Sequence, residues 1–308
     1  AIGGNIRVLG TRAFSTGADY TYNGSASQVT GDGLPSIVRN FTIDNPAGVT
    51  MTGSINVTGA LTMAGGNIVP EANSLLLSNS DPASLIYTSG TIAGNFERYV
   101  SQTSREYLFP VGSLIQTQSL MVNFSDLTAG SLLVRFISGD PGDNGLPLTE
   151  AGDYYLTNQY TTGYWTAQAR NSMSSANYDL DLDATGFGPY PITSGSRIVK
   201  RDGTADWEID GLHSGVTGST VGRESLTSGI SSSPAGTHFG VCKTGPVILM
   251  QPSNSILCQG SSNLAVFTVN ATGFGTLTYQ WYKSPSELLS DDGHFSGTST
   301  SSLGIING

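Results

Sequence analysis

A hydrophobic pattern with a period of about 20 residues runs through the start of this chain and restricts its fold more than any other feature. The repeating positions form three columns: Tyr22, Ile43 and Met63; Val29, Val49 and Ile68; Ile37, Val57 and Leu77. Three short strands in each period are what one coil of a β-solenoid needs, because a coil buries its inward side chains only against the next coil. The pattern predicts a β-solenoid over residues 1–84, with a series of hairpins in a sandwich as the alternative.

The rest of the chain also favours strands. Short β-branched and aromatic runs alternate with Gly, Asn, Asp and Ser, and no stretch shows a sustained helical period. Hydrophobic residues make up 38% of the sequence, which is enough to fill packed cores and argues against disorder. The predicted fold class is therefore all-β: a short β-solenoid, then a β-sandwich, then a truncated immunoglobulin-like domain.

Residues 85–243 lose the period and are predicted to form the β-sandwich, with a jelly-roll arrangement as one form of it. The expected strands are Tyr107–Val111, Ser119–Phe124, Ser131–Ile137, Tyr160–Ala167, Tyr178–Leu182, Arg197–Arg201, Trp207–Ile209 and His238–Cys242. The stretch Gly215–Pro234 is rich in Ser, Thr and Gly and is expected to be a long loop.

Residues 244–308 resemble the first half of an immunoglobulin-like sandwich. Val266–Val269 fits its B strand, Leu277–Lys283 fits a C strand with Trp281 turned inward, and Thr300–Ile305 fits an E strand. The F and G strands have no counterpart, and an open sheet edge over an exposed core is unstable. We therefore expect Trp281 to be buried and the native protein to continue past Gly308.

Charge excludes some classes of partner. The net charge of −10 gives no row of cations to neutralise phosphates, and it disfavours an anionic bilayer. No apolar run approaches the roughly 18 residues of a membrane span. We expect neither nucleic-acid binding nor membrane insertion. The chain begins at Ala1 without Met, which indicates processing or a fragment, and two cysteines are too few to indicate a redox compartment.

Three groups of segments, in this order, resemble large cell-surface proteins of the Bacteroidota, which carry a β-solenoid, a following domain and tandem immunoglobulin-like repeats. The segments are Phe14–Gly24, Gln28–Gly31 and Val38–Asn45; Phe96–Val100 and Tyr107–Gly112; Cys258–Ser262, Leu277–Lys283 and Thr298–Ile305. The resemblance implies export by the type IX secretion route and display on the outer cell surface, within an adhesin-like or gliding-associated protein. It also implies that Cys258 pairs with a later cysteine, which lies beyond this chain, while Cys242 has no implied role.

No catalytic residues are predicted. The three histidines, His213, His238 and His294, stand at no metal-ligand spacing. Two acidic runs alternate with apolar residues, which places each set of carboxylates on the solvated face of a strand. These carboxylates are Asp179, Asp181 and Asp183 in one run and Asp206, Glu208 and Asp210 in the other. A hydrolase would instead need two carboxylates facing each other across a cleft.

Two candidate ligand sites compete with simpler structural explanations. Asp140, Asp143 and Asn144 lie in a Gly/Pro loop whose oxygens suit Ca²⁺, although an ordinary polar turn explains the same residues. Calcium is the single candidate cofactor. The rings of Tyr160, Tyr164 and Trp165 suit stacking on sugar rings, although half of them must face the core if they form a strand.

We therefore expect a non-enzymatic structural and adhesive module of a secreted cell-surface protein, which gives reach and attachment to a surface or a glycan. Its expected partners are that surface or glycan, further immunoglobulin-like repeats of the same chain, and other copies through self-assembly. The alternatives are a carbohydrate-binding sandwich and a polysaccharide-degrading β-helix enzyme. Residues 34–80 speak against the enzyme, because Arg39, Asp44 and Glu71 are the only charged side chains there.

Overall fold

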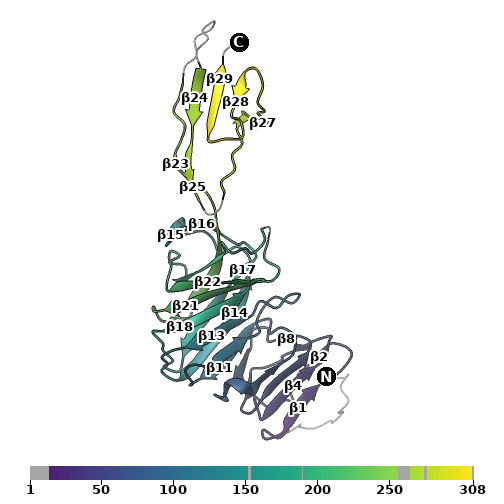
Figure 1. Cartoon of the computed structure of the whole chain (residues 1–308). Helices are drawn as coiled ribbons and strands as arrows, with labels where there is room; N and C mark the ends of the chain where they lie inside the picture. The colour runs from purple at the N-terminus through teal and green to yellow at the C-terminus, as the bar shows by residue number, and fades with distance from the viewer. Residues whose placement is uncertain (1–13, 152–153, 189, 256–263, 274–275, 307–308) are drawn as a thin grey trace. The chain divides into compact units, whose positions relative to one another are not determined.

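The computed structural model describes residues 14–151, 154–188, 190–255, 264–273 and 276–306. The described part is all-β: its elements are strands, apart from the single 3-10 turn η1 (Pro82–Ser84) (Figure 1). The chain divides into two compact units. The first contains residues 1–145 and 159–242, and the second contains residues 146–158 and 243–308.

The first unit begins with a β-solenoid of about four turns. Each of its three faces is a stack of short parallel strands. The first face has β1 (Asp19–Tyr22), β4 (Asn40–Asp44), β7 (Leu61–Gly65) and β10 (Leu85–Tyr87). The second has β2 (Gln28–Val29), β5 (Val49–Thr50) and β8 (Ile68–Val69). The third has β3 (Ile37–Val38), β6 (Ile55–Val57) and β9 (Ser74–Leu77). The predicted solenoid is confirmed.

The register of the first face matches the predicted column. Tyr22 pairs with Ile43, and Ile43 pairs with Met63, in parallel ladders. Ile43 and Met63 are fully buried and Tyr22 is half-buried, so all three point into the coil. The prediction that they form one inward column is confirmed.

The predicted columns of the other two faces were wrong by one residue in the first coil. Gln28, rather than Val29, pairs with Val49, and Val38, rather than Ile37, pairs with Val57. A shift of one residue turns a strand side chain to the opposite face. Val29 and Ile37 are accordingly exposed (58% and 45%), although both are apolar.

The solenoid continues into a wider sheet without a break in hydrogen bonding. Strand β11 (Asn95–Val100) pairs in parallel with β9, as a further coil strand would, and pairs antiparallel with β14 (Gly130–Ser138) on its other edge. The sheet then runs on through β17 (Gly163–Arg170), β22 (Thr237–Thr244) and β19 (Arg197–Asp202). The pairing of β9 with β11 crosses residue 84, so both sides of the predicted domain boundary lie in one unit.

A second, antiparallel sheet completes the first unit. In spatial order its strands are β12 (Glu106–Phe109), β13 (Leu120–Phe124), β18 (Tyr178–Asp183), β21 (Thr220–Leu226) and β20 (Leu212–Thr217). The loop expected over Gly215–Pro234 was wrong, because most of its first half lies in the β20–β21 hairpin. Val216 and Val221 pair across this hairpin, and Gly218 supplies a positive φ (61°) at its turn.

The two sheets of the first unit bury their facing side chains in one core. Phe96 of β11 packs edge-on against Phe109 of β12, with ring centroids 5.7 Å apart. Trp165 of β17 is fully buried, and its Nε1 donates to the backbone oxygen of Gln118 (2.7 Å). Lys200 of β19 reaches Tyr178 of β18, with Nζ 3.3 Å from the phenol oxygen. The sheets are therefore joined by polar as well as apolar contacts.

The second unit consists of small strand groups. They are the hairpin β15 (Leu148–Glu150) with β16 (Tyr154–Gln159); β23 (Val247–Met250) with β25 (Asn270–Thr272); β24 (Leu264–Thr268), β29 (Ser302–Ile306) and β28 (Phe295–Ser296); and β26 (Tyr282–Lys283) with β27 (Glu287–Leu288). Strands β24 and β29 overlap the predicted B and E strands.

The predicted C strand was wrong in extent, and Trp281 was wrong in burial. Of residues 277–283, only Tyr282 and Lys283 form a strand, in the β26–β27 hairpin. Trp281 is half-buried, and its indole Nε1 donates to the backbone oxygen of Thr300 (2.9 Å). No strand among the described residues pairs with Leu277–Gln280, so nothing there completes a sheet over the indole. Cys258 lies outside the described residues.

Candidate functional site

The predicted calcium loop follows β14, and each of its three residues already has a hydrogen-bonding role. Asp140 accepts from the backbone nitrogen of Gly142 (2.8 Å) and Asp143 accepts from that of Gln159 (2.7 Å), both through Oδ1. The backbone oxygen of Asn144 accepts from the backbone nitrogen of Trp207 (2.9 Å). Within the described part of the chain, no three His, Cys, Asp or Glu side chains stand together as a metal site. Calcium binding stays a prediction.

Two of the three predicted stacking rings lie in the core. Trp165 is fully buried and stacks on Phe187, with ring centroids 5.4 Å apart. Tyr160 is 3% exposed, and its hydroxyl lies 2.8 Å from the backbone oxygen of Pro191, to which it donates. Neither ring offers a face to a ligand, because both complete the core between the sheets. Tyr164 is half-buried beside His238, and stacking stays a prediction for this ring alone.

The first acidic run has the predicted alternation. Tyr178, Leu180 and Leu182 are buried along β18, and Asp179, Asp181 and Asp183 lie between them on the outer face. Asp179 accepts from the backbone nitrogen of Ser225 (2.8 Å), and Asp183 accepts from the hydroxyls of Thr185 and Ser219. Partial burial, followed by the carboxylates of Glu106 and Asp179, raises the pKa of Asp181. Asp179 and Asp183 therefore hold neighbouring turns in place through hydrogen bonds, and Asp181 is poorly solvated.

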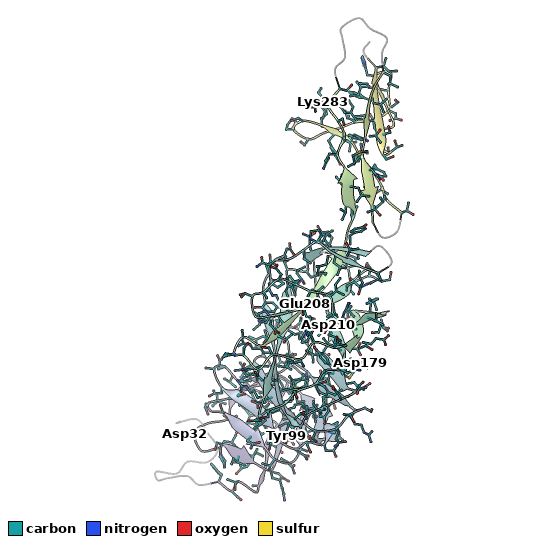
Figure 2. All side chains as sticks on the ribbon, turned by 90° about the vertical axis from the view of Figure 1, so that its left-hand side faces the viewer. Asp32, Tyr99, Asp179, Glu208, Asp210 and Lys283 are labelled. Atoms are coloured by element: carbon teal, nitrogen blue, oxygen red, sulfur yellow. The ribbon has the colours of Figure 1, made fainter. Side chains whose placement is uncertain are left out.

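The second acidic run was predicted wrongly as a strand. Residues 206–210 form only an isolated bridge, between Glu208 and Lys200, although Trp207 is buried as expected (2% exposed). The side chain of Asp210 also departs from the prediction, because it turns inward instead of lying on a solvated face. Figure 2 labels Asp210 together with Glu208.

Asp210 and Lys200 form a nearly buried ion pair. Oδ2 of Asp210 lies 3.4 Å from Nζ of Lys200, with side-chain exposures of 9% and 3%. Oδ2 also accepts from the hydroxyl (2.7 Å) and the backbone nitrogen (3.0 Å) of Ser228. Burial raises the pKa of Asp210, but the donors of Thr227 and Ser228 together with Lys200 outweigh it and leave this pKa below its usual value. The predicted solvated position is therefore wrong for Asp210.

The three histidines lie on different elements, and among the described residues they form no metal-binding group. His238 is 7% exposed, and burial, followed by the positive charge of Arg201, lowers its pKa. His294 contacts the backbone oxygen of Ile306 through Nδ1 (3.1 Å), in the second unit. His213 lies on the edge strand β20.

A groove that sequence reasoning missed lies on the first unit. It is an open hollow of about 680 Å³, lined by four segments that are distant in sequence: residues 71–72, 93–95, 112–115 and 135–138. Its lip is apolar, because the loop after β12 exposes 60% of Leu114 and 93% of Ile115. Glu71 and Arg135 bring opposite charges to the lining. An apolar pair in a loop is the one signal that the sequence offered for this site.

In comparisons with known proteins, no family model, no curated protein and no solved structure matches the chain. The resemblance to the Bacteroidota surface proteins therefore stays a hypothesis from the sequence. No helix among the described residues has the length and apolar character needed to cross a membrane.

Proposed function

We propose that this chain is a structural and adhesive module of a large bacterial cell-surface protein, displayed outside the cell after export by the type IX route. The resemblance of its segments to such proteins of the Bacteroidota supports the export route and the location. One structural observation carries the mechanical part of the proposal. The solenoid ladder continues through β9 and β11 into the antiparallel strand β14.

A continuous ladder makes the first unit a stiff support. In a solenoid each coil contacts its neighbours, so length is added without new topology. Here the last coils share a sheet with β14, β17 and β22, and force along the coils is borne by backbone hydrogen bonds rather than by a linker. A rigid scaffold of this kind suits the presentation of loops for attachment.

The finer fold assignments belong to the same proposal. We assign the two facing sheets of the first unit to a β-sandwich, which is supported by their shared core. We assign the second unit to an immunoglobulin-like domain, which is supported by the pairing of β23 with β25 and by the order β24-β29-β28. Adjacent A, B, E and D strands form one sheet of that fold.

The module acts by attachment rather than by catalysis, with a surface or a glycan as its partner. The test is to incubate the purified chain with a panel of insoluble and soluble polysaccharides, and to measure both adsorption and product release. We expect adsorption without release of reducing or unsaturated sugars. Release of either product would overturn the non-enzymatic assignment, and failure to adsorb to any member would remove the adhesive part.

A further inference from the structure

A row of polar and basic side chains crosses four neighbouring strands of the wider sheet, on the face opposite the core. Arg135 of β14 pairs with Thr166 of β17, and Thr166 pairs with His238 of β22. On its other side, His238 pairs with Arg201 of β19. Directly paired residues in a sheet point to the same face. His238 therefore lies between two arginines, and Nε of Arg135 donates toward it, to the hydroxyl of Thr166 (3.0 Å).

The surroundings of His238 suit a neutral imidazole. The side chain is buried, and its ring lies against that of Tyr164, with centroids 5.0 Å apart. Nε2 lies 3.2 Å from the backbone oxygen of Ala235, and because a carbonyl only accepts, Nε2 carries the proton of the neutral ring. Nδ1 is buried and has no hydrogen-bond partner among the described residues. A second proton would therefore create a buried N–H group without an acceptor.

The charged groups around His238 also disfavour that proton. Burial is the largest cause of its lowered pKa, and the positive charges of Arg201 and Arg135 lower this pKa further. The backbone oxygen of Ala235 and the carboxylate of Asp202 act in the opposite direction without reversing the shift. A protonated His238 would be a third cation in the row, and like charges on directly paired residues destabilise a sheet.

Arg201 also holds the loop of residues 139–145 on the sheet. Its Nη2 donates to the backbone oxygen of Pro141 (2.7 Å), and its Cζ lies 4.0 Å from the ring centroid of Trp207. The indole Nε1 of Trp207 donates in turn to the backbone oxygen of Gly142 (2.7 Å). Because Arg201 is buried under these contacts, its guanidinium reaches water only if they break.

The strand positions favour movement of Arg201 over movement of His238. His238 has a short side chain on β22, which pairs with β17 on one edge and with β19 on the other. Arg201 has a long side chain on β19, whose second edge carries the isolated bridge between Lys200 and Glu208. We propose that His238 is an acid-sensitive latch: its protonation repels Arg201 and releases loop 139–145 from the sheet. The inference goes beyond the adhesive function and does not depend on it.

The test is hydrogen exchange of the whole chain at pH values about one unit above and about one unit below the ordinary histidine pKa of about 6.5. Rates are corrected for the intrinsic effect of pH and are read in peptides covering residues 139–145 and Trp207, whose backbone nitrogen donates to the oxygen of Asn144 (2.9 Å). With the loop open, His238 regains its ordinary pKa, so opening becomes more favourable by up to about tenfold at the lower pH. We expect a several-fold rise in these peptides and none in solenoid peptides covering residues 61–69.

Three variants identify the group that responds to pH. His238→Gln is neutral at both pH values and should abolish the rise. Arg135→Gln removes a neighbouring cation whose Nε is bonded to Thr166 rather than to the loop. It should raise the pKa of His238, seen in the NMR titration of the ring, and make the rise in exchange smaller. The matched control is His294→Gln, which removes a histidine of the second unit and should respond as wild type does.

Three outcomes would overturn the inference: equal exchange of loop 139–145 at both pH values, an undiminished rise in His238→Gln, or an equal rise in the solenoid peptides. The last would indicate a general loss of stability in acid instead of a local opening. Thermal unfolding checks that each variant is folded. If His238→Gln does not fold, Arg135→Gln decides, because a response to pH identical to that of wild type would show that the row of cations does not control the loop.

Discussion

Replacing Gly66 by Ala should destabilise the solenoid more than the same change at Gly31 or Gly53. Gly66 follows β7 at a corner of the coil, with φ at +86°, and a Cβ placed on it would overlap the backbone oxygen of Asn45 in the coil before. Asn45 is fully buried, and its backbone nitrogen donates to the oxygen of Gly65 (3.0 Å). The substitution therefore acts on the contact between two successive coils.

The expected loss follows from two effects. An L-residue in the left-handed region loses about 1–2 kcal/mol relative to glycine. Separating the coils also breaks the Asn45–Gly65 bond and leaves buried backbone groups unpaired, at about 1–3 kcal/mol for each group. With two unpaired groups, these give a decrease of about 3–8 kcal/mol in the free energy of unfolding.

Two control substitutions separate these effects. At Gly31, φ is +73° and no atom lies within 4 Å of the added Cβ, so Gly31→Ala should lose only about 1–2 kcal/mol. At Gly53 the Cβ also has open space and φ is not left-handed, so Gly53→Ala should be neutral or stabilising by up to about 1 kcal/mol.

The assay is hydrogen exchange of peptides covering residues 41–69 as a function of urea, which reports on the coils themselves. Far-ultraviolet circular dichroism under the same conditions checks the global fold. If Gly66→Ala unfolds at the same urea concentration as Gly31→Ala, the coils do not approach as closely as described, and the argument from carbonyl overlap is refuted.

Three further predictions address register, charge and thiol chemistry. Val38→Asp should lower the free energy of unfolding by several kcal/mol in urea melts and Ile37→Asp by less than about 0.5 kcal/mol, because Val38 is buried and Ile37 is exposed; equal effects would contradict the register. Asp210→Asn should lose about 3 kcal/mol at neutral pH. Because its folded-state pKa is depressed, the stabilisation by Asp210 is present above its unfolded pKa and lost as pH falls through the folded value. Acid titration of stability should therefore be flatter in the variant than in wild type. In a Cys258→Ser background, Cys242 should resist thiol reagents until the protein unfolds, because it is buried and burial raises its pKa; rapid modification of the native protein would contradict this.

The sequence by itself determined the strand class, the solenoid and most strands of the first unit. These follow from local rules, since alternation fixes which side chains turn inward and the period near 20 residues fixes which strands stack. The column of Tyr22, Ile43 and Met63 is an example, because each strand holds the same alternation at nearly the same spacing. The buried Tyr178, Leu180 and Leu182 are another.

Only the tertiary structure decided the features that depend on which segments meet. Val29 and Ile37 look like core residues, but a one-residue difference in turn length sets them outside. Asp210 looks like a surface carboxylate, yet it lies inward, paired with Lys200 of strand β19 and with the backbone nitrogen of Ser228. Trp165 looks like a sugar-stacking ring, but the opposite sheet covers it. The groove is lined by four segments that are distant in sequence. No pattern along the chain predicts this groove, because it forms where the parallel solenoid ladder passes into the antiparallel sheet.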